Sequence, residues 1–384
     1  MKEYLEGSQA IAKAVALCRP GVISAYPITP QTHIVEGLAQ MIADGELRAE
    51  FVNVESEHSA CSCCLGASAT GVRAYTSTSS QGLLLMTEVI FNVAGLRLPL
   101  VLTCANRAVS APINIWNDHQ DSLTVRDSGW IQFYAESIQE AVDLHIQAYR
   151  LSEDKRVLLP VMVCVDGYIL THGYEVVDIP SQEEVDRFLP PYQLEYKLDP
   201  DNPLTLGVLA GPDYYMETRY AIQKTMEDVL KIIPEISAEF FKIFGRRSGG
   251  LIERYYLEDA EKVIVAMGSV CGTIKEVVDD LREKRKKVGL LKIITYRPFP
   301  QDEIYQSLKK AKEIAVLEKA ISLGGAGPLY TEIKSIFQGK KEVPKISGFI
   351  AGLGGRDITK KSIENVLERL SDKQVDSEFV DLKL

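Results

Sequence analysis

The chain has 384 residues, more than one hydrophobic core usually organises, so about two domains are expected. Its apolar (46%) and charged (25%) fractions are typical of a globular protein, and a net charge of -10 argues against nucleic acid or an anionic membrane as partner. The sequence contains neither an apolar run of the ~20 residues that span a bilayer nor a signal peptide, which favours a cytoplasmic protein.

Short apolar runs alternate with helix-like segments between residues 22 and 166. Strands are predicted at residues 22–25, 50–54, 72–76, 100–104, 131–135 and 159–165. Helices are predicted at residues 32–44, 57–69, 81–94 and 138–152. This alternation is typical of βαβ units, so it predicts an α/β fold with a parallel sheet and helices on both faces.

The next region is less regular. Residues 180–213, rich in Pro, Asp and Tyr, are predicted to form a long surface excursion. Residues 215–244 are predicted to be mostly helical, with a turn at Pro234. The basic, glycine-rich residues 245–250 are predicted to link a first domain, residues 1–244, to a smaller α/β domain, residues 251–384. In the second domain, strands are predicted at 263–267, 288–295 and 314–318, and helices at 272–286 and 301–311.

Seven cysteines in so long a chain do not form a disulfide framework. Cys61, Cys63 and Cys64 are the only cluster, and their C-x-C-C spacing lacks the C-x2-C-x2-C pattern typical of iron–sulfur ligands. We interpret them as packed thiols. The chain is therefore expected to carry no metal cluster of its own.

Three polar segments, residues 26–30, 54–60 and 106–108, each follow a predicted strand directly. Ligands of open α/β sheets bind outside the carboxyl ends of the strands, so these segments are expected to converge on one pocket. Glu57 lies where a strand turns into a helix of small residues, and a poorly hydrated carboxylate there could share a proton with a ring nitrogen. The alternative is an acidic residue that only stabilises a helix N-terminus. Glu55 cannot face the same way on an extended segment.

Two further residues bring polar groups to this pocket. Thr29 lies between two prolines, which stiffen the loop that carries its hydroxyl. Arg107 can offer a carboxylate its planar fork of donors. The alternatives are that Thr29 lies in a turn without a binding role and that Arg107 forms only a surface ion pair.

The loop at residues 110–121 is long, aromatic and polar, which is typical of a functional loop. Its His119 could transfer protons or be a satisfied structural histidine. The glycines of residues 351–357 lack the spacing of a phosphate-binding or dinucleotide motif, so they are interpreted as a plain turn.

Six segments together resemble the α subunits of pyruvate:ferredoxin oxidoreductases. They are residues 26–30 (YPITP), 54–60 (VESEHSA), 79–83 (SSQGL), 106–118 (NRAVSAPINIWND), 126–132 (RDSGWIQ) and 296–300 (YRPFP). The resemblance extends in order from about residue 7 to residue 357. Gln31 and Thr32 depart from it, since many relatives have serine or threonine there.

The resemblance implies a thiamine-diphosphate enzyme divided among subunits. This chain would supply the pyrimidine-binding domain and a smaller domain similar to the transketolase C-terminal domain. A β subunit would hold the diphosphate and Mg²⁺, because this sequence lacks a Gly-Asp-Gly motif followed by paired asparagines. Ferredoxin-like γ and δ subunits would carry [4Fe-4S] clusters, and coenzyme A would be the co-substrate.

The resemblance also assigns roles to residues. Glu57 corresponds to the catalytic glutamate that bonds the aminopyrimidine ring, with the stretch Tyr26, Pro27 and Ile28 beside the cofactor. Thr29 and Arg107 correspond to the residues that hold the substrate carboxylate. Side chains of the following loop are expected to support them, with no metal site in this chain; these side chains are Asn114, Asn117, Asp118 and His119.

The implied reaction is the reversible oxidative decarboxylation of pyruvate with coenzyme A to acetyl-CoA and CO2, with electrons passed to ferredoxin. One arginine and one threonine suit a single carboxylate, which disfavours a dicarboxylate. The alternatives are a sister enzyme for 2-oxoisovalerate, 2-oxoglutarate or oxalate, a transketolase-like carbon-transfer enzyme, or a non-catalytic nucleotide-binding subunit with flavodoxin-like domains.

Overall fold

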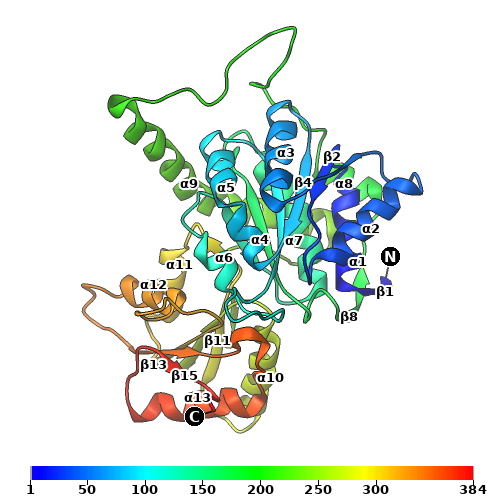
Figure 1. Ribbon diagram of the computed structural model, residues 1–384. Helices are drawn as coiled ribbons and strands as arrows, with labels where there is room; N and C mark the ends of the chain where they lie inside the picture. Colours follow the sequence, from blue (N-terminus) through cyan, green and yellow to red (C-terminus); the bar gives the residue numbers. More distant parts are fainter. Residues whose placement is uncertain (1, 384) are drawn as a thin grey trace.

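The computed structural model describes residues 2–383 and contains two large sheets, each flanked by helices, beside a small two-stranded one (Figure 1). The first sheet has the strand order β12-β6-β7-β5-β4-β2-β3, and all its strands except β12 run parallel. Its parallel strands are β2 (Val22–Ala25), β3 (Glu50–Asn53), β4 (Ala74–Thr78), β5 (Val101–Asn106), β6 (Ile131–Tyr134) and β7 (Val161–Asp166). The predicted parallel sheet is confirmed.

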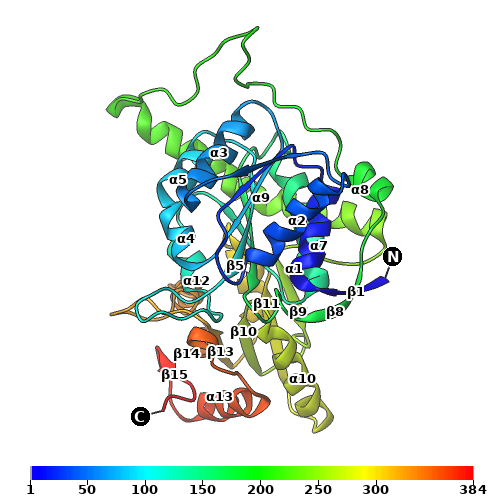
Figure 2. The ribbon, with the colours of Figure 1, turned by 45° about the vertical axis from the view of Figure 1, so that its right-hand side comes forward.

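Helices cover both faces of the first sheet, with α3, α4 and α5 on one side and α1, α2 and α7 on the other (Figure 2). Their bounds are α1 (Gly7–Leu17), α2 (Thr32–Ala43), α3 (Glu57–Ala69), α4 (Ser80–Leu85), α5 (Thr87–Gly95), α6 (Gln120–Thr124) and α7 (Ile138–Ser152). Capping side chains fix two of the helix starts, because Ser56 and Ser137 accept the backbone N–H of Ser59 and Glu140. Each face of the sheet buries its own apolar core.

The helix predicted at residues 81–94 is two helices, because Met86 adopts a turn conformation (φ -76°, ψ -7°) between α4 and α5. Two further elements, β1 (Lys2–Glu6) and β8 (Tyr174–Asp178), form a separate antiparallel pair that the sequence analysis did not predict. A short helix, α8 (Gln182–Phe188), begins the predicted excursion with a capping box at Ser181.

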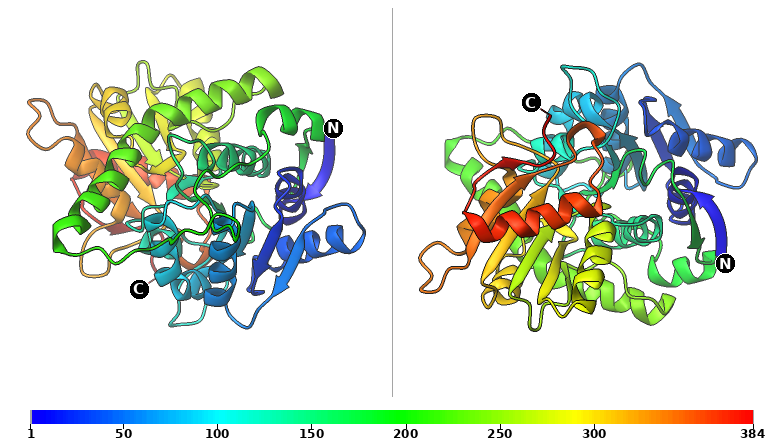
Figure 3. Two further views of the ribbon diagram at one scale, coloured as in Figure 1. Left: turned by 90° about the horizontal axis from the view of Figure 1, so that it is seen from above. Right: turned by 90° about the horizontal axis from the view of Figure 1, so that it is seen from below.

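The predicted turn at Pro234 is wrong, because α9 (Pro212–Phe244) runs through it as one helix, seen from above in Figure 3. A proline removes one backbone hydrogen bond from a helix interior. Burial of Ile232, Ile233 and Ile236 on either side of Pro234 holds α9 in the first core against α7 and α8. Packing of this apolar face therefore outweighs the cost of the proline.

The second sheet has the order β15-β14-β13-β10-β11-β9, with only β9 antiparallel to its neighbour. Its strands are β9 (Ile252–Tyr255), β10 (Lys262–Ala266), β11 (Val288–Ile293), β13 (Glu313–Glu318), β14 (Lys345–Ile350) and β15 (Glu378–Phe379). Its helices are α10 (Val270–Glu283), α11 (Gln301–Leu308), α12 (Pro328–Ile336) and α13 (Lys360–Asp372), with the 3-10 turn η1 at Leu353–Gly355. The predicted linker, residues 245–250, lies between α9 and β9.

The strand predicted at residues 288–295 extends across both sheets. After β11 the chain passes through Ile294 into β12 (Thr295–Arg297), which pairs antiparallel with β6 at the edge of the first sheet. Periodicity cannot reveal this change of sheet, because both halves of the segment are buried. Among the described residues, no helix is long and apolar enough to cross a bilayer.

Candidate active site

The polar segments predicted to converge do lie at one edge of the first sheet. Strands β2, β4, β5 and β7 run parallel, so residues 26–30, 79–80 and 107 follow their carboxyl ends at one edge, where Asp166 ends β7. The start of α3 follows β3 at the same edge. This edge is the place where open α/β sheets bind ligands.

Glu57 occupies the first turn of α3 and is only 7% exposed, whereas Glu55 is exposed and accepts the Ser59 hydroxyl at 2.7 Å. Within residues 2–383 the Glu57 carboxylate has no hydrogen-bond or ion-pair partner. It lies against Gly82, where an added Cβ would come within 2.6 Å of Glu57 Oε1 and 2.5 Å of Thr78 Oγ1. The absence of a side chain at Gly82 therefore leaves space beside this carboxylate.

The Thr78 hydroxyl is buried, and it too has no hydrogen-bond partner in the described chain. Because the Thr78 hydroxyl is enclosed by the protein, the Glu57 carboxylate is the group of this pair that a ligand can meet. A carboxylate acceptor fits the ring nitrogen of an aminopyrimidine. The residues present thus fit the pyrimidine half of thiamine diphosphate.

Gln31 anchors the loop at residues 26–30. Its side-chain amide donates to Ser77 O at 2.9 Å and Ser77 Oγ at 2.8 Å, while its oxygen accepts the Ile28 N–H at 3.3 Å. These hydrogen bonds fix the position of the loop relative to β4. Tyr26, Pro27 and Thr29 are exposed on the surface of the loop. Gln31 is fully buried, which explains how this departure from the family pattern is accommodated.

Arg107 and Thr29 are brought together, as predicted. Arg107 Nη1 donates to the Thr29 carbonyl at 2.9 Å, and Nε donates to the Asn114 carbonyl at 2.9 Å. The side chain is 7% exposed, and its Nη2 has no hydrogen-bond partner among residues 2–383. Two neutral carbonyls therefore orient the guanidinium without neutralising it, which leaves its charge available to an anionic ligand.

Asp121 is a residue that the sequence analysis did not single out. Its buried carboxylate accepts the Ser80 N–H at 2.9 Å, the Arg107 N–H at 3.0 Å and the Asn106 amide at 2.8 Å. Burial raises the pKa of Asp121, and these donors counteract the rise. Asp121 thereby fixes the start of α4, beside Glu57, relative to Arg107. A lone acidic residue in a polar loop gives no sequence signal for such a role.

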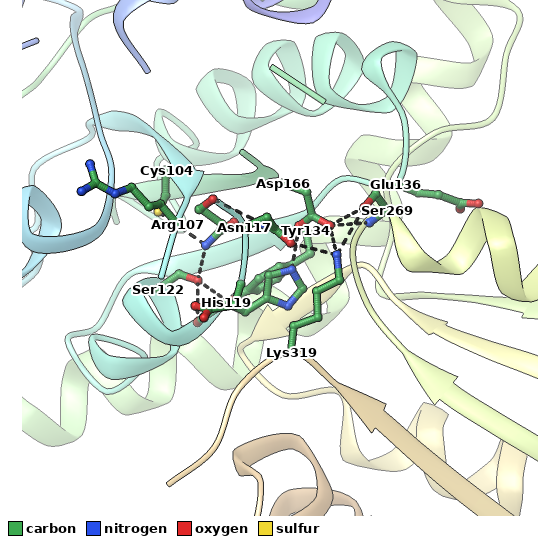
Figure 4. Close-up of polar contacts among 12 residues, drawn as sticks. Cys104, Arg107, Asn117, His119, Ser122, Tyr134, Glu136, Asp166, Ser269 and Lys319 are labelled. Atoms are coloured by element: carbon green, nitrogen blue, oxygen red, sulfur yellow. Dashed lines mark hydrogen bonds and ion pairs between the residues drawn. The ribbon is translucent and has the colours of Figure 1, made fainter. Parts of the chain in front are cut away.

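His119 belongs to a buried network that joins the two halves of the chain (Figure 4). Its Nε2 lies 2.7 Å from Asp166 Oδ1, while Lys319 Nζ, from the end of β13, donates to Asp166 Oδ2 at 2.6 Å and Asn117 Oδ1 at 2.9 Å. Burial alone would raise the pKa of Asp166, but the Lys319 ammonium and the His119 ring hold it well below its usual range. In Figure 4 the Arg107 guanidinium points away from this network.

The loop at residues 114–118 also contacts the glycine turn η1. Asn114 Nδ2 donates to Gly354 O at 3.1 Å, Asp118 Oδ2 accepts the Gly354 N–H at 3.1 Å, and the Asn117 carbonyl accepts the Gly355 N–H at 2.7 Å. Burial raises the pKa of Asp118 to about 6. The turn thus has a packing role, and these side chains join the Arg107 loop to the second sheet.

Gly355 shows why this turn needs glycine. Its φ is +80°, and an added Cβ would lie 2.3 Å from Trp116 Cβ. The cysteine cluster, by contrast, packs as predicted for its two buried members: Cys61 and Cys64 lie in the core, and burial raises the pKa of the Cys61 thiol to about 12.

Comparison with known proteins relates this architecture to one family. Residues 13–238 match the family model described as pyruvate flavodoxin/ferredoxin oxidoreductase, thiamine-diphosphate-binding, and residues 260–363 match pyruvate:ferredoxin oxidoreductase core domain II. The chain is 54% identical to pyruvate synthase subunit PorA of Methanothermobacter thermautotrophicus, over 99% of this chain and 98% of that one. It is 44% identical to ketoisovalerate oxidoreductase subunit VorA of Pyrococcus horikoshii, over 100% and 97%.

Solved structures share the fold. The 2-oxoglutarate:ferredoxin oxidoreductase of Magnetococcus marinus superimposes with a TM-score of 0.75 at 19% identity, covering 96% of this chain and 65% of that chain, so this chain spans about two thirds of it. A split-gene transketolase superimposes with a TM-score of 0.54 at 12% identity, over 96% and 98%.

The first family model covers more than half of the chain, and relatives about half identical cover nearly all of it. The chain therefore belongs to the pyruvate:ferredoxin oxidoreductase family, in which it corresponds to the α subunit and contributes a thiamine-diphosphate-binding domain.

Proposed function

We propose that this chain is the α subunit of a multi-subunit enzyme that oxidatively decarboxylates pyruvate with coenzyme A to acetyl-CoA and CO2. Electrons pass to ferredoxin, and the reaction is reversible. The observation that carries this proposal is the pair of unsatisfied groups at one sheet edge: the buried Glu57 carboxylate and the Arg107 guanidinium oriented by Thr29. Relatives named pyruvate synthase, at 47–54% identity, support the choice of substrate.

Thiamine diphosphate supplies the electron sink that lets a 2-oxo acid lose CO2. Glu57 would hold a proton at the ring nitrogen of its pyrimidine, in the space that Gly82 leaves beside this carboxylate. Arg107 would bind the substrate carboxylate through the donors that Thr29 and Asn114 leave free. Tyr26, Pro27 and Ile28 would border the cofactor on the loop that Gln31 anchors.

Partner subunits complete the site in this proposal. A β subunit holds the diphosphate and Mg²⁺, and γ and δ subunits carry the [4Fe-4S] clusters that pass electrons to ferredoxin in the cytoplasm. Ile113 and Trp116 support a partner here, because they are 81% and 52% exposed on the loop that holds Arg107. Residues 1–244 form the pyrimidine-binding domain in this scheme, 245–250 the linker and 251–384 the second domain.

The test of the reaction is a substrate panel on the intact complex. Pyruvate, 2-oxoisovalerate, 2-oxoglutarate and oxalate are each supplied with coenzyme A and a viologen acceptor, and the visible spectrum is recorded. We expect brown iron–sulfur absorption and the highest kcat/KM for pyruvate. A preference for 2-oxoisovalerate would instead favour the activity named for the 44% identical relative. A complex without iron–sulfur absorption would exclude electron transfer through clusters.

The division of the cofactor site is tested by calorimetry. The isolated chain should bind thiamine diphosphate weakly until the β subunit is added, because it supplies only the pyrimidine half of the site. Tight, Mg²⁺-dependent binding by this chain alone would contradict a divided site.

A further inference from the structure

We propose that Glu6, His33 and His172 form a binding site for a divalent transition metal of the Zn²⁺ class. The three residues are half-buried, and one candidate ligand atom from each lies within 4.8 Å of the others. They lie far apart in the sequence, at the end of β1, in the first turn of α2 and in the turn after β7. The fold therefore assembles the cluster.

The geometry is close to that of a three-ligand site. His33 Nδ1 lies 2.7 Å from Glu6 Oε1, and the rings of His33 and His172 face each other with centroids 4.7 Å apart. Ligand nitrogens and oxygens lie about 2.0–2.2 Å from zinc, so ligand atoms in a tetrahedral site are separated by roughly 3.3–3.6 Å. Small rotations of these half-buried side chains would separate the Glu6 and His33 atoms and bring all three ligand atoms to this spacing.

A neighbouring hydroxyl group can orient one of the ligands. Thr171 Oγ1 lies 2.8 Å from His172 Nδ1 and can accept its hydrogen, which leaves the Nε2 lone pair for a metal. The same hydroxyl oxygen accepts the Tyr168 N–H at 2.8 Å, so its position is fixed. Outer partners of this kind hold metal-binding histidines in one orientation.

The ligand types select the metal. Two imidazoles and one carboxylate suit Zn²⁺ and other late first-row ions, whereas Mg²⁺ and Ca²⁺ prefer sites made only of oxygen. An ion pair between His33 and Glu6 is the ordinary explanation for this contact, but it does not account for the His172 ring that lies against His33. A metal would bind both rings as ligands.

A bound ion would join three segments beside the candidate active site. His33 lies two residues after Gln31, which anchors the loop at residues 26–30. His172 lies in the turn whose Thr171 and Gly173 carbonyls already accept the N–H groups of Ser8 and Gly7. The expected role is therefore structural, and it does not depend on the proposed reaction.

The test is a Zn²⁺ titration of the full-length chain, purified without a histidine tag, by calorimetry. We compare the wild type with His33→Ala, His172→Ala and Glu6→Gln. His58→Ala is the matched control, because the His58 side chain is 44% exposed, like that of His33, and it also lies near a glutamate, Glu88. Circular dichroism verifies that each variant is folded.

We expect one equivalent of Zn²⁺ to bind the wild type and His58→Ala equally. Affinity should fall at least ~10-fold in each of the three site variants, as is typical of losses at a metal site. Co²⁺ should give the visible absorption of a site with nitrogen ligands in the wild type and lose it in His172→Ala. Absence of Zn²⁺ binding to the wild type, or equal binding to all variants, would overturn the proposal.

Discussion

Replacing Arg107 by alanine is expected to lower kcat/KM for pyruvate by about 10²–10⁴ while thiamine-diphosphate affinity stays nearly constant. Two of the guanidinium nitrogens are held by the Thr29 and Asn114 carbonyls, and Nη2 is left to meet a carboxylate. Breaking a buried charge pair by removing one partner costs ~3–5 kcal/mol. At about 1.4 kcal/mol for each tenfold change, this corresponds to two to four powers of ten.

Two further variants define the cause of this loss. Arg107→Lys keeps the positive charge, but its single ammonium group cannot donate to both carbonyls and also bind a carboxylate with two parallel hydrogen bonds. Its kcat/KM should therefore lie between those of the wild type and the alanine variant. Arg19→Ala is the control, because Arg19 pairs with Asp186 on the surface and should leave kcat/KM unchanged.

The assay is steady-state viologen reduction by the assembled complex, beside calorimetry of thiamine-diphosphate binding. Thermal unfolding of each variant separates a local loss from general destabilisation, because Arg107 also ties the Thr29 loop to the Asn114 loop. An unchanged kcat/KM in a folded Arg107→Ala complex would remove Arg107 from the substrate site.

Glu57→Gln should leave thermal stability nearly unchanged but abolish hydrogen exchange at the thiazolium carbon of the cofactor, as followed by NMR; exchange at the wild-type rate would refute its role. Lys319→Met should lower the free energy of unfolding by ~3–5 kcal/mol, because it leaves the Asp166 carboxylate charged and buried without its lysine partner. Adding Asp166→Asn to this variant should restore part of the lost stability. Losses of stability that simply add in the double variant would contradict this coupling. Burial raises the pKa of Glu318 to about 8 from its ordinary 4.5, so the folded state keeps a proton that the unfolded state releases. Stability should therefore fall as pH rises from about 4.5 to about 8, and Glu318→Gln should flatten that slope in melting curves; equal slopes would refute the shift.

Local sequence patterns predicted much of the first sheet. Helix α3 was predicted with its observed bounds from the run of small residues that follows a strand, and the structure adds that Ser56 caps it. The pocket at the carboxyl edge could be predicted without knowing the strand order, because all strands of a parallel sheet have their carboxyl ends at the same edge. Thr29 and Arg107 accordingly meet as expected.

Other features depend on contacts between distant segments, and these no local pattern reveals. Asp121 gathers donors from the ends of β4 and β5, and Lys319 reaches Asp166 from the second sheet. Pro234 misled the prediction because the packing of its isoleucine neighbours, which holds α9 together, is a tertiary effect. Gly354 and Gly355 were interpreted as a plain turn because no local pattern shows that Asn114 and Trp116 pack against them.

Strand β12 belongs to the first sheet although it follows β11 of the second sheet in the chain, and this affects how the protein can be divided into fragments for experiments. The first sheet ends on a strand borrowed from residues 295–297, so a fragment cut at residue 250 would leave β6 as an unprotected edge. Three of the four residues of β6, Ile131, Phe133 and Tyr134, are buried apolar residues. An uncovered apolar edge strand is a template for aggregation. A fragment cut at residue 250 should therefore precipitate where the full-length chain remains in solution.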